Sequence, residues 1–228
     1  MRQLTKGDKP AVLVANEDAW TQEYLHAVAT DDPKKHEHWR HPEIKDGLHA
    51  ETSGKCAYCE ALVSDVSYPH VEHIIPKSPR PELAHRWHNL TWACPVCNGN
   101  KREYYDEQYA VLNPYADDPD NHIMFTGCFV SQHFGASRGE ITIKKLKLNR
   151  PDLVYARAER LSKLREMVER WYEADGARKD VLAEAIRIDA DEGEFSASVI
   201  QYLNDIGFPI GLGVGQANRL AGDRVPLE

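Results

Sequence analysis

Two cysteine pairs, CAYC at residues 56–59 and CPVC at residues 94–97, enclose the sequence EHIIP at residues 72–76. Each C-x-x-C turn presents two thiolates, so two turns supply the four soft ligands of a structural zinc ion. The paired spacing favours zinc over redox chemistry or chance placement in the core. The 34 residues between the two pairs exceed what a simple zinc ribbon needs. We therefore expect an inserted element between them.

The inserted element is predicted to be two short arms followed by a helix. Valine, tyrosine and isoleucine in residues 66–75 predict a first strand that ends at Pro76, residues 90–93 predict a second, and residues 98–104 predict the start of a helix. The zinc would join the two ends of this unit and bring Glu72 near Asn98. Carboxylate and amide oxygens are ligands for Mg²⁺ or Mn²⁺. His73 is expected on the opposite face of the strand, where a neutral imidazole accepts a proton from water.

The whole chain is predicted to be an α+β protein, mostly helical around a zinc-stapled ββα core with a small β-hairpin. We expect four zones: a helical segment at 1–55, the metal zone at 56–110, a turn-rich segment with the hairpin at 111–150, and a helical segment at 151–228. Within them the patterns predict helices at 19–29, 42–52 and 153–171 (the last ending near Gly176), strands at 123–130 and 140–148, and a loose glycine-rich tail at 211–215.

Length and composition are those of one compact domain with additions. The chain has 228 residues, of which 42% are hydrophobic, and no apolar run approaches a membrane span. No secretory leader is visible, so we expect a cytoplasmic protein whose five cysteines are reduced. Cys128, the cysteine outside the pairs, is predicted to be a buried small hydrophobe and not a reactive thiol.

The net charge of −8 is unusual for a protein that would contact nucleic acid. Residues 51–110 carry 6 basic and 8 acidic side chains, and residues 151–228 carry 10 and 15. Either a local basic patch is hidden in these totals or a partner holds the nucleic acid. We favour the partner.

The residues of the metal zone resemble the HNH endonuclease family. The resemblance is carried by Cys56-x-x-Cys59, by Glu72-His73-Ile74-Ile75-Pro76, by Asn89-Leu90 and by Cys94-x-x-Cys97-Asn98-x-x-Lys101. It implies a ββα-metal fold with a structural Zn²⁺ and one catalytic Mg²⁺ or Mn²⁺. The activity it implies is hydrolysis of nucleic-acid phosphodiesters. Carried over by position, Glu72 and Asn98 are the catalytic metal ligands, His73 is the general base, and Asn89 braces the loop between the arms. The acidic ligand is usually aspartate, so Glu72 departs from the pattern by a longer side chain.

A wider set of residues resembles the PtuB family, the HNH subunits of Septu antiphage defence and of a related retron system. These residues lie at 41–45, 54–60, 113–119 and 148–150. The resemblance implies an effector nuclease that works in a complex with an ATPase subunit resembling PtuA. Two alternatives remain open: a non-catalytic zinc-ribbon module that recruits or regulates a partner, and a free-standing HNH nuclease. The choice between DNA and RNA also remains open.

Several polar residues near the motif have two possible roles. Asn98 would be a metal ligand, a helix N-cap, or both, and Lys101 and Arg102 would contact phosphate or solvent. His70, His85 and His88 are expected to be exposed or capping, with His88 the best further catalytic candidate. The run His36, His38, His41 around Trp39 is not interpreted as a metal site.

Overall fold

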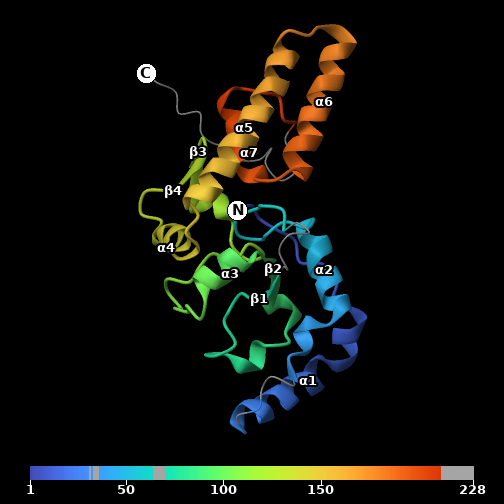
Figure 1. The fold of residues 1–228 in the computed structure, drawn as a ribbon, viewed down its shortest axis with the longest axis vertical. Helices are drawn as coiled ribbons and strands as arrows, with labels where there is room; N and C mark the ends of the chain where they lie inside the picture. The colour runs from blue at the N-terminus through green and yellow to red at the C-terminus, as the bar shows by residue number, and fades with distance from the viewer. Residues whose placement is uncertain (31, 33–35, 64–69, 212–228) are drawn as a thin grey trace, which may run out of the picture.

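The computed structural model describes residues 1–30, 32, 36–63 and 70–211. The molecule is elongated, with α1 at one end, the helices α5 and α6 at the other, and the hairpin of β1 and β2 between them (Figure 1). The elements, in chain order, are α1 (Ala11–Ala29), η2 (His38–Arg40), α2 (Pro42–Thr52), β1 (His70–His73), η3 (Pro81–Leu83), η4 (Trp87–Asn89), β2 (Leu90–Ala93), α3 (Pro95–Lys101), η5 (Pro119–Asn121), β3 (Ile123–Thr126), β4 (Phe129–Gln132), α4 (Ser137–Leu146), α5 (Pro151–Tyr172), α6 (Gly176–Glu192) and α7 (Ser196–Asp205).

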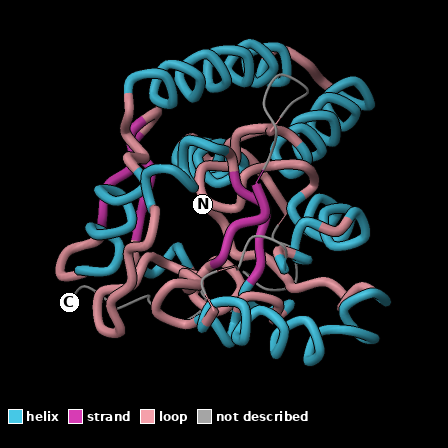
Figure 2. Tube along the Cα trace, turned by 60° about the horizontal axis from the view of Figure 1, so that its bottom comes forward, coloured by secondary structure: helices cyan, strands magenta, loops and turns pink. Residues whose placement is uncertain are grey.

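The centre of the molecule is a ββα unit. Strand β1 pairs antiparallel with β2, so that Glu72 lies opposite Thr91 and His73 opposite Leu90. Helix α3 follows at once, with Cys94 at its N-cap, where the sulfur accepts a hydrogen bond from the Cys97 backbone N–H at 3.3 Å. Figure 2 shows this hairpin (magenta) near the middle of the molecule with helices (cyan) around it. The metal zone is therefore in the interior of the fold.

Helices α1 and α2 cover one side of the hairpin. Their buried side chains form one core cluster with Trp39, Trp87, Leu90 and Trp92. Pro42 stands at the first turn of α2, and Ser53 just after the helix adopts a left-handed conformation (φ 52°). The prediction of a helix at 42–52 is confirmed. Helix α1 also ends at the predicted Ala29, but it begins at Ala11, because Pro10 occupies its N-cap.

The C-terminal helices form a core of their own. Leu164, Val168 and Trp171 of α5 pack against α6 and α7 and are 9% exposed or less. The Lys55 ammonium group joins this unit to the metal zone, since it donates to the carbonyl oxygens of Asp191, Glu192 and Gly193 at 3.1 to 3.2 Å. The apolar face predicted from Leu153 to Trp171 is thus mostly internal packing. Gly176 begins α6, after the end of α5 at Tyr172.

Two strand predictions in residues 111–150 were wrong in detail. Residues 123–130 do not form one strand, because Gly127 (φ 58°) turns the chain between β3 and β4. Residues 140–148 belong mainly to helix α4, not to a strand. Gly139, Thr142 and Leu146 recur at helical spacing and are buried, and this periodicity outweighs the short alternation of isoleucines.

The predicted fold class is confirmed: the chain is mostly helical around a ββα core with a small hairpin. None of the helices in the described part of the chain is long and apolar enough to cross a membrane. Cys128 is half-buried in the turn between β3 and β4. The loose tail predicted at residues 211–215 and the start of the first predicted strand lie almost entirely outside the described residues.

Replacement of Trp171 by alanine is expected to destabilise the protein. The indole is 9% exposed and packs against Phe208 with ring centroids 4.8 Å apart, so its loss removes about 3 kcal/mol or more from the free energy of unfolding. The neighbouring Tyr172 is 55% exposed, and Tyr172→Ala should cost about 1 kcal/mol or less. Urea denaturation followed by circular dichroism measures both values. Equal losses would contradict the assignment of Trp171 to the internal core.

Candidate functional site

The four paired cysteines meet at one point. The sulfur atoms of Cys56, Cys59, Cys94 and Cys97 all lie within 4.8 Å of one another, and Cys59 and Cys94 are 3.9 Å apart. A zinc ion with Zn–S bonds of about 2.3 Å would hold tetrahedral sulfur atoms roughly 3.8 Å apart. Three of the four side chains are buried. The donor set and its spacing fit a closed structural zinc site, as the sequence predicted.

An arginine from the start of the C-terminal unit lies against this cluster. The Arg150 guanidinium approaches the sulfur of Cys97 at 3.8 Å and that of Cys59 at 4.0 Å. Four thiolates around Zn²⁺ leave a net charge of −2, and a neighbouring cation offsets part of it. Arg150 also precedes α5 directly. The thiolate cluster therefore connects the ββα unit to the start of the C-terminal helices through the charge of Arg150.

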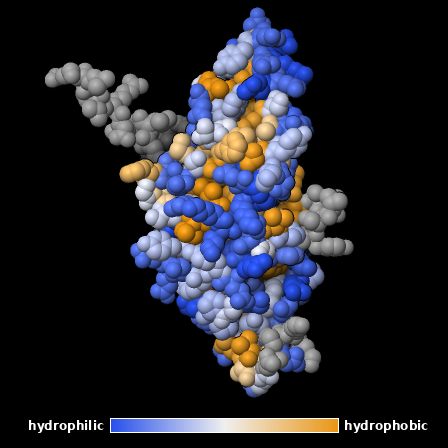
Figure 3. All heavy atoms as spheres, turned by 60° about the vertical axis from the view of Figure 1, so that its left-hand side comes forward, coloured by the Kyte–Doolittle hydropathy of each residue, from blue (hydrophilic) through white to orange (hydrophobic). Residues whose placement is uncertain are grey.

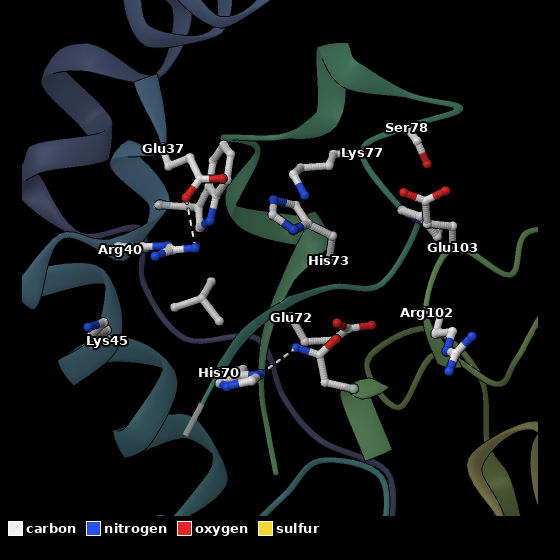
Figure 4. A pocket seen from close by; sticks show the side chains of 14 residues that line it. Glu37, Arg40, Lys45, His70, Glu72, His73, Lys77, Ser78, Arg102 and Glu103 are labelled. Carbon is white, nitrogen blue, oxygen red and sulfur yellow. Dashed lines mark hydrogen bonds and ion pairs between the residues drawn. The ribbon is translucent and has the colours of Figure 1, made fainter. Parts of the chain in front are cut away.

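A cavity of about 500 Å³ opens beside the hairpin. Glu72, His73 and Asn98 all line it, and side chains from the segment around η2, from α2 and from the end of α3 complete its wall. In Figure 4, His73 and Lys77 lie close together at the centre, with Arg40 and Lys45 on one side and Arg102 and Glu103 on the other. Three of the four residues taken from the HNH resemblance thus share one cavity.

His73 is held by its ring nitrogen Nε2, which lies 2.9 Å from the backbone oxygen of Ala84. A carbonyl only accepts, so Nε2 carries the proton and Nδ1 is the basic nitrogen. Trp39 packs edge-to-face on the ring at 4.9 Å. Burial lowers the pKa of His73 to about 3, against the opposing effect of the Ala84 carbonyl, so the ring is neutral. A neutral imidazole on a cavity wall can accept a proton at its free nitrogen, although a pKa of about 3 makes it a weak base.

Glu72 is buried and paired with Lys101. The two side chains are 4% and 2% exposed, and the Lys101 Nζ lies 2.6 Å from Glu72 Oε1. Burial raises the pKa of Glu72, and the Lys101 cation opposes that shift. Lys101 also donates to the backbone oxygen of His73 at 2.8 Å. One lysine therefore contacts two of the predicted site residues, whereas the sequence left it between phosphate contact and solvent.

Asn98 lies in the middle of α3 and not at its N-cap, which is Cys94. Its side-chain Nδ2 donates to His70 Nδ1 at 2.9 Å, leaving the amide oxygen as the group available to a cation. Glu72 Oε1 is buried against the Lys101 ammonium group, so an ion at this carboxylate would compete with Lys101. These two hard oxygen donors on one cavity wall fit a Mg²⁺ or Mn²⁺ ion that keeps several waters.

Asn89 fixes the loop that follows β1. Its side-chain oxygen accepts from the Ile75 backbone N–H at 2.8 Å, and its Nδ2 donates to the oxygens of Ile75 (2.9 Å) and Leu83 (3.2 Å). The residue is 2% exposed and does not line the cavity. Its geometry is that of a brace, with no direct contact to the reacting centre.

Sequence reasoning missed the basic rim of the cavity. Arg40, Lys45, Lys77 and Arg102 line it, and Arg40 is paired with Glu37 at 2.7 Å. Lys77 follows Pro76 in the motif, but Arg40 and Lys45 come from the N-terminal segment and carry no pattern that joins them to the hairpin. Local positive charge therefore exists at the cavity within the acidic total, beside the carboxylates of Glu37, Glu72 and Glu103. The preference for a partner that holds the nucleic acid stays a prediction.

The other histidines have different surroundings. His85 is fully buried and not exposed or capping as expected, whereas His88 is exposed and away from the cavity lining. His70 lies at the cavity through its bond to Asn98. His36 and His38 approach Glu23 of α1, while His41 caps α2 by accepting from the Glu43 N–H at 3.3 Å.

Comparison with known proteins supports the resemblance. Residues 56–103 match the family model of the HNH endonucleases. The chain is 35% identical to Septu protein PtuB from Bacillus thuringiensis over 179 residues. This aligned region makes up 74% of this chain and 66% of that protein. It is 30% identical to Septu protein PtuB from Bacillus mycoides strain KBAB4 over 155 residues. That aligned region makes up 54% of this chain and 52% of the relative. The matched regions thus span less than two thirds of either relative.

The resemblance to the HNH endonucleases and to PtuB is confirmed by these matches. The family match begins at Cys56, passes through both strands of the hairpin and ends two residues after Lys101. It therefore encloses the thiolate cluster and the cavity residues of the hairpin and α3. Residues 56–103 of the chain are thus similar to the HNH endonucleases.

Replacement of Cys94 by serine is expected to abolish folding. Structural zinc sites contribute free energy on the order of 10 kcal/mol, comparable to the whole stability of a domain. Cys94→Ser should give insoluble protein, or soluble protein without a cooperative thermal transition. Cys128→Ser, outside the cluster, is the matched control and should fold with its zinc. A folded Cys94→Ser variant that lacks zinc in this cluster would refute the structural role.

Proposed function

We propose that this chain is a divalent-metal-dependent HNH endonuclease that hydrolyses nucleic-acid phosphodiesters as the effector of an antiphage defence complex with an ATPase partner. The observation that carries the proposal is the shared cavity of Glu72, His73 and Asn98 inside the HNH match. A non-catalytic zinc module would need neither a buried carboxylate nor a fixed neutral histidine at that cavity. These features therefore favour an enzyme over a non-catalytic zinc module.

The proposed chemistry assigns a separate task to each residue. His73 takes a proton from water at Nδ1 while its Nε2–H stays bonded to the Ala84 carbonyl. The oxygen of that water bonds to phosphorus, the bond from phosphorus to the leaving sugar oxygen breaks, and the leaving oxygen takes a proton from solvent water. A Mg²⁺ or Mn²⁺ ion held by Glu72 and Asn98 would stabilise the charge that develops on the phosphate. Asn89 keeps the loop after β1, and hence the position of His73, fixed.

The basic rim is proposed to hold the substrate backbone. Lys45, Lys77 and Arg102 are the rim cations for which we assign phosphate contact, since Arg40 is already paired with Glu37. These contacts neutralise phosphates and carry no base information. The chemistry acts on the phosphodiester, so neither DNA nor RNA is favoured by the cavity residues.

The ATPase partner, which we propose resembles PtuA, is supported by the similarity to Septu protein PtuB. Because Trp171 is internal, the surface proposed for docking is limited to exposed apolar residues of the C-terminal helices. Figure 3 displays apolar side chains among charged ones on the half of the molecule that contains these helices. The exposed members on α5 and α6 are Tyr155, Tyr172, Val181 and Ile188.

His73→Ala is expected to lower the cleavage rate about 10²- to 10⁴-fold, the usual loss on removal of a general base. Zinc content and unfolding midpoint should stay close to the parent values. His88→Ala, an exposed histidine on η4, is the matched control and should cleave normally. Glu72→Gln and Asn98→Ala should instead raise the Mg²⁺ concentration needed for half-maximal rate. Full activity of His73→Ala in the assembled complex would exclude it as the base.

The isolated chain is expected to be a much weaker nuclease than the chain with its partner. The test expresses it with and without an ATPase subunit that resembles PtuA, and compares cleavage at equal zinc and magnesium. Tyr155→Glu and Val181→Glu, at 68% exposed positions, should reduce co-purification without loss of thermal stability. Equal cleavage by the chain alone would favour a free-standing HNH enzyme.

A further inference from the structure

Three potential metal ligands meet between α1 and the segment that leads into η2. The carboxylate of Glu23 and the ring nitrogens of His36 and His38 all lie within 4.8 Å of one another. One oxygen, Glu23 Oε2, is 3.7 Å from His36 Nδ1 and 3.5 Å from His38 Nε2. These residues are outside the HNH match and outside the nuclease cavity.

The distances fit a shared ion better than direct hydrogen bonds. Hydrogen bonds between nitrogen and oxygen span about 2.7 to 3.2 Å, so both separations are too long. A tetrahedral zinc ion with bonds of about 2.0 to 2.1 Å would hold its ligand atoms roughly 3.4 Å apart. The two measured separations lie close to that value. Two imidazoles and one carboxylate are also a known zinc donor set, which leaves a fourth position for water.

An unpartnered buried nitrogen provides a second, independent observation. His38 Nε2 is buried and has no hydrogen-bond partner among the described residues. His85 lies beside it, with ring centroids 5.9 Å apart, and is 0% exposed. Buried polar atoms almost always have partners. An ion on His38 supplies the missing partner of that nitrogen.

Packing already orients the histidine for this role. Trp20 of α1 stacks on the His38 ring at 4.6 Å and an interplanar angle of 19°. The indole rings of Trp20 and Trp39 lie 6.1 and 5.1 Å from His85. This aromatic surround limits the rotation of both rings. An ion would therefore find the His38 nitrogen held in place before it binds.

We propose that Glu23, His36 and His38 form a second metal site, for Zn²⁺ or a similar first-row divalent ion, that fixes the wall of the nuclease cavity. The site joins α1 to the chain just before Trp39. Trp39 lies edge-to-face on His73 at 4.9 Å, and Glu37, Trp39 and Arg40 all line the cavity. The ion acts on structure, and its ligands do not touch the reacting centre.

Metal counting on the full-length, untagged protein tests the site without any nuclease assay. After Zn²⁺ loading and removal of free metal without a chelator, mass spectrometry should find two zinc ions per chain. His36→Ala and Glu23→Gln should each retain one. Glu23 is exposed, so its variant leaves the core intact. His26→Ala, an exposed histidine on the same helix, is the matched control and should retain two.

Cobalt spectroscopy separates the two sites. Co²⁺ at the cysteine cluster gives sulfur-to-metal charge-transfer absorption, and Co²⁺ at the proposed site should add ligand-field absorption without further charge transfer. One metal ion per parent chain, with no second phase in the cobalt titration, would overturn the proposal in favour of a plain histidine–carboxylate ion pair. The proposal would also be overturned if the His36→Ala and Glu23→Gln variants each retained two zinc ions per chain. Neither result bears on the nuclease assignment.

Discussion

The four-thiolate cluster is the constraint on which the rest of this structure depends. It joins the chain before the hairpin to the N-terminus of α3, and the hairpin itself has only four residues in each strand. A two-stranded hairpin of this size is marginally stable alone in water. Zinc binding on the order of 10 kcal/mol supplies the missing stability. The four-thiolate cluster therefore fixes the position of α3 relative to β1, and with it the position of Asn98 relative to Glu72.

The same cluster explains how the C-terminal helices are attached. Arg150 contacts the sulfurs of Cys59 and Cys97 just before α5 begins, and Lys55, next to Cys56, binds the carbonyl groups at the end of α6. Arg150 offsets the negative charge of the thiolates, to which it is close in space. Lys55, which is next to Cys56 in sequence, donates hydrogen bonds to backbone carbonyl groups of the C-terminal unit. Loss of the zinc ion would therefore disturb both ends of the molecule together.

Features set by local sequence were predictable, whereas those set by tertiary packing were not. The C-x-x-C spacing predicted the thiolate cluster, and the helical pattern predicted the bounds of α2. Three of the four residues named by the motif line one cavity, Glu72, His73 and Asn98. The burial of Lys101 was not predictable, because a lysine on a short helix is equally suited to solvent until its neighbours are known. The approach of Glu23 to His36 and His38 likewise depends on how α1 folds back. Strand alternation at 140–148 misled because Thr142 and Gly139, small or polar residues, form the buried face of α4.

The net charge of −8 and the basic cavity rim are compatible because they act over different distances. At physiological salt a charge is screened within about 8 Å. Lys45, Lys77 and Arg102 therefore offset the carboxylates of Glu37, Glu72 and Glu103 at the cavity, while the acidic C-terminal helices would affect the approach of a long nucleic acid. On the proposed function, a scissile phosphate would meet cations at the rim, whereas the strand beyond it would face the acidic surface. This division favours a partner that carries the flanking nucleic acid and leaves only the reacting phosphate to this chain.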